Sequence, residues 1–431
     1  MIRSFVFTTQ PNPNLFAFFY NLFVAASLLL ARVAALFHAK TRRWLAGQAQ
    51  SKRHLLAWSN RDGSKTAWFH AASLGEFEQG RSVITAFRAQ YPDYKIVLTF
   101  FSPSGYEIQK NYELADAVLY LPADTPANVN GFLDAIQPNI AFFIKYEFWY
   151  NYLTELRRRG VPTLLFSAIF RPNQLFFKPY GGFYRKMLFC FDQIAVQNQA
   201  SRQLLASINY QNATQTGDTR LDRVAQVAAQ AREIPRIAQF KNNTPLLIIG
   251  SAWPDDMAVL IPFLNQWPQP LKVIVAPHEI NAAQIETWQK QLNISSLKWS
   301  AAMAGAPLAA TDCLFIDSVG LLSALYRYAD FAFIGGAYGD GLHNILEPAA
   351  FGMPLFFGNR YFDKFQEALD LCQQKAAHAV ANAHELALLF ATVYNDETLR
   401  AKQAATCRNY VQAQTGATER VMKIVATMVD N

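Results

Sequence analysis

Short apolar runs alternate with helix-length amphipathic segments along most of the chain. In the first half, runs of strand length lie at residues 66–69, 95–100, 140–144, 163–166 and 193–196. After a polar stretch the alternation resumes, with runs at residues 246–250, 271–277, 313–316, 331–334 and 354–357. Apolar strands separated by helices are typical of parallel sheets that helices cover on both faces. The pattern therefore predicts two doubly wound α/β domains in tandem, with ligands bound in a cleft at the C-terminal ends of the strands.

A charge-free apolar segment precedes both domains. Residues 14–31 contain no Asp, Glu, Lys or Arg, and Leu-rich sequence continues to His38, which just reaches the roughly 20 residues that cross a bilayer. Only Arg3 precedes the segment, whereas five basic residues follow it: Lys40, Arg42, Arg43, Lys52 and Arg53. The positive-inside rule then places the rest of the chain in the cytoplasm. Both a spanning helix and a helix lying half-buried in the cytoplasmic leaflet fit this pattern.

These patterns divide the chain into four parts. We predict a membrane anchor at residues 1–40, an N-terminal Rossmann-like domain at 41–220, a linker at 221–242 and a C-terminal Rossmann-like domain at 243–431, which includes the last helix. The linker is assigned because this stretch is polar and contains few strand-forming residues.

Composition narrows the classes of partner. Of 431 residues, 52% are hydrophobic and 16% charged, so the chain can form large cores. The formal charge of +7 favours an anionic partner: nucleic acid, a phosphorylated substrate or an acidic lipid surface. The four cysteines lie far apart in the sequence, at Cys190, Cys313, Cys372 and Cys407. Their spacing argues against a disulfide scaffold or a cysteine zinc site.

A glycine-rich stretch in the C-terminal domain is the first candidate site. After the apolar run 331–334 come four glycines, Gly335, Gly336, Gly339 and Gly341, and a helix is expected to open near His343 or Asn344. Free backbone N–H groups at such an opening attract anions, and Glu347 follows in the first turn. The pattern predicts a nucleotide-holding site. A tight turn between strand and helix, with Glu347 serving the helix dipole, fits equally well.

Two motifs in the N-terminal domain follow predicted strands. Glu76, after the first strand, can act as a general base on a sugar hydroxyl, but Ser73 and Glu76 also have the spacing of a capping box. His70 can equally be a satisfied histidine at the strand end. Lys145 and Glu147 follow the run 140–144. They can bind an acceptor and its phosphate or carboxylate, or they can simply begin a helix.

Three further strand ends in the C-terminal domain carry polar or turn-forming residues: 250–256, 275–279 and 317–321. No phosphate-binding P-loop is present, and no G-x-G-x-x-G follows the first strand of either domain. No Asp-x-Asp pair is present either, and His, Cys and acidic residues do not cluster at metal-ligand spacing. Nothing in the sequence therefore calls for a metal.

Taken together, the motifs resemble those of the 3-deoxy-D-manno-octulosonic acid (Kdo) transferases of lipopolysaccharide assembly, which have the GT-B fold. In chain order they are Ala72-Ser73-Leu74-Gly75-Glu76, Glu147-Phe148-Trp149, Gly250-Ser251, Pro277-His278, Gly336 and Gly341-x-His343-Asn344-x-Leu346-Glu347-Pro348. With the N-terminal anchor, the match covers nearly the whole chain. It implies an N-terminal acceptor domain and a C-terminal nucleotide-sugar domain, two Rossmann-like domains facing a cleft.

The resemblance implies transfer of Kdo from CMP-Kdo to a lipid A precursor, lipid IVA, with inversion and with neither metal nor other cofactor. The enzyme would be held at the cytoplasmic face of the inner membrane by a single anchor, with its catalytic domains in the cytoplasm and no nucleic-acid partner. The alternatives are another GT-B transferase with a different nucleotide sugar, and a non-catalytic lipid- or carbohydrate-binding relative.

The resemblance also implies residue roles. Glu76 would be the general base, and the acceptor-binding residues would be Ser73, Gly75, Lys145 and Glu147. The nucleotide-binding residues would be Ser251, Pro277, His278, Val319, Gly320, Leu321, Asn344, Ile345, Leu346 and Glu347. Two positions depart from the family. The family has Pro-Arg-His where this chain has Pro277-His278-Glu279, so either His278 stands in for the arginine or one residue is deleted. A histidine would supply only partial charge at the phosphate at pH 7. Leu321 replaces an acid, which leaves backbone contacts there.

Overall fold

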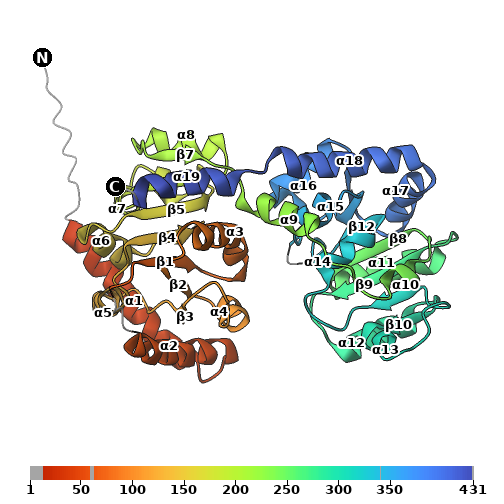
Figure 1. The fold of residues 1–431 in the computed structure, drawn as a ribbon, viewed down its shortest axis with the longest axis horizontal. Coiled ribbons are helices and arrows are strands. Elements are labelled where there is room, and N and C mark those ends of the chain that lie inside the picture. Colours follow the sequence, from red (N-terminus) through yellow and green to blue (C-terminus); the bar gives the residue numbers. More distant parts are fainter. Residues whose placement is uncertain (1–12, 59–62, 340, 430–431) are drawn as a thin grey trace, which may run out of the picture. The chain divides into compact units, whose positions relative to one another are not determined.

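The computed structural model describes residues 13–58, 63–339 and 341–429 (Figure 1). Residues 1–12 of the predicted anchor and Asp340 of the glycine-rich stretch lie outside the described residues. The chain forms two compact units, one of Met1–Arg220 with Gly416–Asn431 and one of Leu221–Thr415.

The first unit contains a parallel sheet of seven strands in the order β3-β2-β1-β4-β5-β6-β7. The strands are β1 (Thr66–Ala71), β2 (Lys95–Phe100), β3 (Ala117–Tyr120), β4 (Ile140–Ile144), β5 (Thr163–Ala168), β6 (Gln193–Val196) and β7 (Ala213–Gln215). The helices are α3 (Leu74–Gln90), α4 (Pro103–Gln109), α5 (Pro126–Ile136), α6 (Tyr150–Arg158), η1 (Leu175–Phe177), α7 (Gly182–Leu188) and α8 (Gln199–Ser207). Neighbouring strand residues enter different cores: Trp68 and Phe143 lie in one, Phe69 and Phe142 in the other. Burial on both faces explains the continuous apolar runs.

The second unit repeats this plan, with a parallel sheet of seven strands in the order β10-β11-β9-β8-β12-β13-β14. The strands are β8 (Leu246–Ala252), β9 (Lys272–Pro277), β10 (Ser296–Lys298), β11 (Cys313–Phe315), β12 (Phe331–Ile334), β13 (Leu355–Gly358) and β14 (Ala377–Val380). The helices are α9 (Thr219–Ala229), α10 (Ile237–Lys241), α11 (Pro254–Gln266), α12 (Ala282–Gln291), α13 (Trp299–Met303), α14 (Leu322–Leu325), η2 (Tyr326–Tyr328), α15 (Leu346–Phe351), η3 (Phe362–Lys364), α16 (Gln366–Gln373), α17 (Ala383–Asn395) and α18 (Glu397–Ala413). The ten predicted strands all form, and the prediction of a doubly wound α/β fold is confirmed.

Two helices precede the first sheet, α1 (Pro13–Ala34) and α2 (Ala39–Ala57). Among the described residues, one helical stretch, Leu15–Ala34, is long and apolar enough to cross a membrane. One face of α1 nevertheless packs on the first unit. The Tyr20 hydroxyl donates to Oδ2 of Asp124 at 2.6 Å, and the Asn151 amide donates to Oδ1 of Asn21 at 2.8 Å.

The two compact units divide the chain differently from the predicted domains in two segments. The expected linker at 221–242 forms α9 and α10, whose apolar residues, among them Leu221 and Phe240, are buried in a core of the second unit. The last helix, α19 (Ala417–Val429), belongs to the first unit rather than to the C-terminal domain. It lies beside α3 (Figure 1), with Val421 in the core that also holds Phe77. Composition does not indicate which core receives the apolar face of either segment.

Candidate active site

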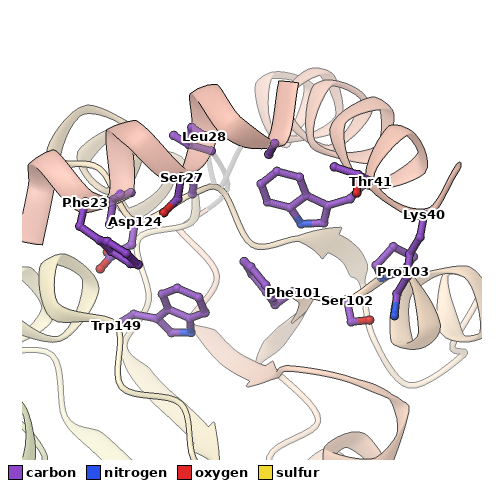
Figure 2. A pocket seen from close by; sticks show the side chains of 14 residues that line it. Phe23, Ser27, Leu28, Lys40, Thr41, Phe101, Ser102, Pro103, Asp124 and Trp149 are labelled. Atoms are coloured by element: carbon purple, nitrogen blue, oxygen red, sulfur yellow. The ribbon is translucent and has the colours of Figure 1, made fainter. Parts of the chain in front are cut away.

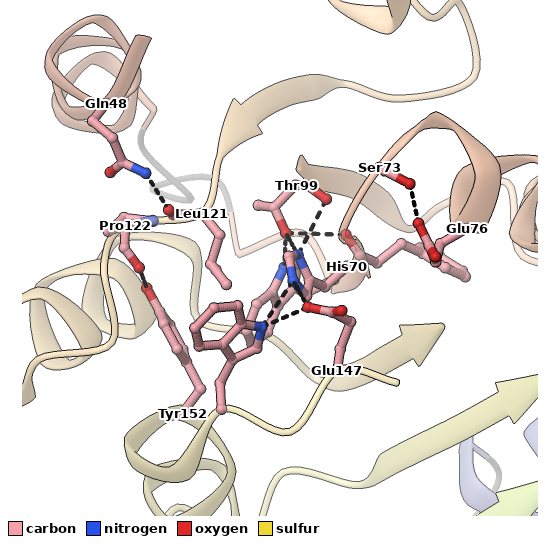
Figure 3. Close-up of polar contacts among 12 residues, drawn as sticks. Gln48, His70, Ser73, Glu76, Thr99, Leu121, Pro122, Glu147 and Tyr152 are labelled. Atoms are coloured by element: carbon pink, nitrogen blue, oxygen red, sulfur yellow. Dashed lines mark hydrogen bonds and ion pairs between the residues drawn. The ribbon is translucent and has the colours of Figure 1, made fainter. Parts of the chain in front are cut away.

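The turn from β1 into α3 carries Ser73, Gly75 and Glu76. Ser73 is the N-cap of α3, but its side chain accepts no hydrogen bond from the helix backbone. Its hydroxyl donates instead to Oε2 of Glu76, which lies half-buried in the first turn (Figure 3). A capping box needs the backbone N–H of Glu76 to bind the serine oxygen, so this alternative is not formed. The serine orients the glutamate carboxylate.

Charged residues surround Tyr146, which lies between Lys145 and Glu147. Burial raises the pKa of Tyr146, the cations Arg171 and Arg220 lower it, and the carboxylate of Glu76 raises it. Tyr146, Glu76 and the two arginines are therefore close enough to interact electrostatically. The sequence analysis missed Arg171, in the loop after β5, and Arg220, in the first turn of α9, because neither belongs to a recognisable motif.

Lys145 and Glu147 point to different neighbours. Lys145 adopts a left-handed backbone with φ of 70°, and its ammonium lies over the Tyr146 ring at 5.4 Å from the centroid. Glu147 is 8% exposed. Its Oε2 contacts His70 Nε2 at 3.0 Å and accepts from Trp149 Nε1 at 2.7 Å (Figure 3).

His70 is fully buried on β1. Its Nδ1 lies 2.9 Å from the Thr99 hydroxyl on β2. His70 is thus a buried strand-end histidine with a hydrogen-bond partner at each ring nitrogen, and Glu147 is one of these partners. The carboxylate of Glu147 is held inside the first unit by His70 and Trp149, beside the predicted acceptor residues.

In the second unit, Asp256 ties two strand ends together. Its buried carboxylate oxygen Oδ2 accepts from the backbone N–H of Trp253 at 2.9 Å, after β8, and from that of Gly336 at 2.8 Å, after β12. Gly336 has φ of 96°, and a Cβ there would meet the Gly341 carbonyl oxygen at 2.3 Å, so only glycine fits. Burial raises the pKa of Asp256 to about 6, partly offset by the two N–H bonds.

Three aromatic rings stack at the ends of β8, β9 and β12. The His278 ring lies 4.1 Å from that of Trp253 and 4.5 Å from that of His343, centroid to centroid. Trp253 Nε1 donates to His343 Nε2 at 2.8 Å. Burial lowers the pKa of His278, although Glu279 opposes it, and burial lowers the pKa of His343 to about 4. Both rings are therefore largely neutral at pH 7, and the partial charge expected of His278 is smaller than its ordinary pKa suggests.

Of the predicted nucleotide residues, Asn344, Leu346 and Glu347 are linked by hydrogen bonds, and Ser323, two residues after the predicted stretch 319–321, joins them. The Ser323 hydroxyl donates to Oε2 of Glu347 at 2.6 Å, and the Asn344 amide donates to Oε1 at 3.3 Å. Asn344 Oδ1 accepts from Leu346 N–H at 3.1 Å. The helix that follows, α15, opens at Leu346 and not near Asn344 as expected, and it is only six residues long. Its dipole is correspondingly weak, so the start of this helix offers an anion little stabilisation.

The sequence is similar to those of known transferases. Residues 42–223 match the sequence family described as 3-deoxy-D-manno-octulosonic-acid transferase. A relative of that name from Chlamydophila psittaci is 28% identical over 310 residues, which cover 68% of this chain and 69% of the relative. Another from Haemophilus influenzae is 26% identical over 308 residues, covering 69% and 71%. The chain is thus similar to this family of glycosyltransferases, through the family match at residues 42–223 and through relatives that align over about two thirds of its length.

Solved structures are similar to this chain in fold. MurG from Acinetobacter baumannii superposes with a TM-score of 0.54 at 16% identity, covering 84% of this chain and 99% of that one. A putative UDP-N-acetylglucosamine 2-epimerase from Listeria monocytogenes superposes with a TM-score of 0.58 at 11% identity, covering 85% and 97%. The predicted family and GT-B fold are confirmed, while the roles of individual residues stay predictions.

Proposed function

We propose that this transferase moves Kdo from CMP-Kdo to a hydroxyl of the lipid A precursor lipid IVA, with inversion and without a metal. The arrangement at Glu76 carries the proposal. The Ser73 hydroxyl binds Oε2 and leaves Oε1 to take the proton of the acceptor hydroxyl. As that oxygen bonds to the anomeric carbon of Kdo, the bond from this carbon to the CMP phosphate oxygen breaks, and CMP departs with the electron pair.

Basic residues near Glu76 fit an anionic lipid. Arg171, Arg220 and Lys145 lie around Tyr146, and a phosphorylated disaccharide needs cations of this kind. Arg220 is partly neutralised, because it pairs with Asp218 at 2.6 Å. Arg171 is therefore a stronger candidate than Arg220 for the acceptor phosphates.

The second unit would hold CMP. The Glu347 carboxylate accepts a hydrogen bond from the Ser323 hydroxyl. A ribose hydroxyl is a donor of the same kind. Trp253, His278 and His343 offer a flat aromatic surface at the strand ends, where Ser251 and Pro277 also lie. Gly320, with φ of 85°, and its neighbours Val319 and Leu321 would contribute backbone groups.

The helix α1 would attach the enzyme to the cytoplasmic face of the inner membrane. Its outward face is apolar and exposed, whereas Tyr20 and Asn21 on the other face bind the first unit. Because a helix in the interface buries only one face in lipid, these bonds favour the half-buried arrangement over the spanning one.

A turnover assay with the full-length protein tests the proposal. We expect CMP-Kdo and a tetra-acylated lipid A precursor to yield Kdo-lipid and CMP in equal amounts. The same assay with other nucleotide sugars separates the alternatives. Turnover with another donor and none with CMP-Kdo would favour a different GT-B transferase, and no turnover with any donor would favour a non-catalytic relative.

A further inference from the structure

An apolar pocket lies between α1, α2 and the C-terminal edge of the first sheet (Figure 2). Its volume is about 560 Å³, within the range of pockets that hold a small organic ligand. One wall is α1, from Phe23 to Ala31, and the other is α2, with Thr41 and Trp44. The wall from Phe23 to Ala31 is on the order of 12 Å long at the rise of an α-helix.

The floor of the pocket is built from aromatic rings that the protein holds in place. The Trp149 ring lies 4.9 Å from Phe101, and Phe101 lies 5.7 Å from Trp44 on α2. The polar edge of Trp149 is turned to the protein, where Nε1 donates to Glu147. Glu147 is itself fixed by His70. This buried network leaves the apolar face of Trp149 to the pocket.

The one acidic side chain in the lining does not make the pocket polar. Asp124 accepts from the Tyr20 hydroxyl and from the backbone N–H groups of Asn151 and Tyr152. Burial raises its pKa, and the three hydrogen bonds oppose this shift. What remains for an occupant is an apolar channel with Lys40 and Ser102 toward one end (Figure 2).

The two ends of the pocket connect different parts of the enzyme. Phe23 lines one end, is 70% exposed and also belongs to the apolar outward face of α1. Ser102 lies toward the opposite end, and its N–H donates to the carbonyl of Ala72 at 2.7 Å, one residue before Ser73. The pocket thus joins the membrane-facing surface to the turn that carries Glu76.

We propose that this pocket binds one acyl chain of the lipid acceptor, with the headgroup at the Lys40 end. The proposal rests on the proposed function, since it assumes an acylated sugar as acceptor. Three features support a lipid occupant: the apolar lining, the continuity with the outward face of α1, and the short path to Ser73. The ammonium of Lys40 would bind a phosphate of the headgroup at this end.

The pocket can be filled without touching the proposed catalytic residues. Ser27 lines the pocket from α1, whereas its neighbour Ala26 is exposed and faces away. Ser27→Phe inserts a ring into the space for the chain, and Ala26→Phe adds the same ring outside it. Thr41→Trp fills the pocket from the opposite wall, so the result does not depend on α1 alone.

The test compares two acceptors with the full-length protein, the tetra-acylated lipid and its fully deacylated disaccharide, each with CMP-Kdo. Each methylene lost from an apolar site weakens binding about fourfold. We expect Ser27→Phe and Thr41→Trp to raise the KM for the acylated acceptor by roughly tenfold or more, with kinetics on the deacylated acceptor unchanged. Ala26→Phe should match the wild type on both acceptors. An unchanged ratio of the two KM values in both filled variants would overturn the proposal.

Photolabelling separates this proposal from the proposed function. An acceptor analogue with a diazirine at the end of one acyl chain should label peptides that contain Phe23 or Trp149, even where no Kdo is transferred. If these peptides are labelled but no Kdo is transferred, the proposed function is refuted and the pocket is still supported as an acyl-chain site. Labelling elsewhere, or equal labelling by diazirine phosphatidylethanolamine that excess acceptor does not compete away, would show that the pocket is not an acceptor site.

Discussion

Asp256 should make the stability of the second unit depend on pH in a direction opposite to that of most acids. Burial raises its pKa from 3.8 to about 6, so between these values the folded protein holds a proton that the unfolded chain has lost. Stability is then greatest below the unfolded pKa and falls as pH rises through the folded pKa. The full loss is on the order of 3 kcal/mol, of which about 1 kcal/mol falls between pH 5 and pH 8.

Asp256→Asn isolates this contribution. The amide oxygen can still accept from Trp253 and Gly336, but it carries no charge at any pH. Urea unfolding of the detergent-solubilised chain at pH 5 and pH 8, with exchange of the Gly336 amide as local reporter, should show the variant gaining about 1 kcal/mol on the wild type across this range. Asp255→Asn, which removes an exposed charge from the same helical turn, is the control. A constant difference between wild type and Asp256→Asn at both pH values would refute the reasoning.

Three further predictions concern the nucleotide site and the membrane. Glu347→Ala should weaken CMP binding by about 1–3 kcal/mol if the carboxylate binds the ribose hydroxyls, and equal affinities by calorimetry would exclude that contact. Because burial lowers the pKa of His278 from 6.5, CMP affinity should be flat from pH 7 to 8.5 and rise only at lower pH. A steady fall above pH 7 that His278→Arg abolishes would contradict this. Leu29→Lys with Leu30→Lys, at side chains 63% and 69% exposed, should weaken membrane binding by roughly 3–6 kcal/mol, and Leu388→Lys in the second unit should not. Retention of the double variant in the membrane fraction would show that this face does not hold the protein there.

The central strands could be predicted from the sequence because helices cover both of their faces. Every residue of β4 is buried, and such a strand reads as an unbroken apolar run. The outer strands β7 and β10 are three residues long and half-buried or exposed in most positions, so no apolar run marks them. The sequence analysis therefore did not predict these two edge strands, one in each sheet.

The sequence indicated which loops carry the candidate site residues, but not which side chains contact one another. Functional side chains gather at the C-terminal ends of parallel strands, which is why Ser73, Glu76 and Glu347 could be chosen in advance. The side-chain contacts could not be predicted from the sequence, because His70 and Glu147 are 77 residues apart and Trp253 and His343 are 90 residues apart. No periodicity of helix or strand reports contacts over such distances.

Turnover by Glu76→Gln tests the central claim most directly. The full-length wild type and Glu76→Gln would be compared for Kdo transfer from CMP-Kdo to the tetra-acylated acceptor, with CMP binding measured in parallel. Glu78→Gln is the matched control, since Glu78 pairs with Arg81 at 3.0 Å two residues further along the same helix. We predict that Glu76→Gln keeps its CMP affinity and loses about a hundred- to ten-thousandfold in kcat, while Glu78→Gln stays near the wild type. Near-normal kcat in a folded, CMP-binding Glu76→Gln would contradict the assignment of Glu76 as the general base.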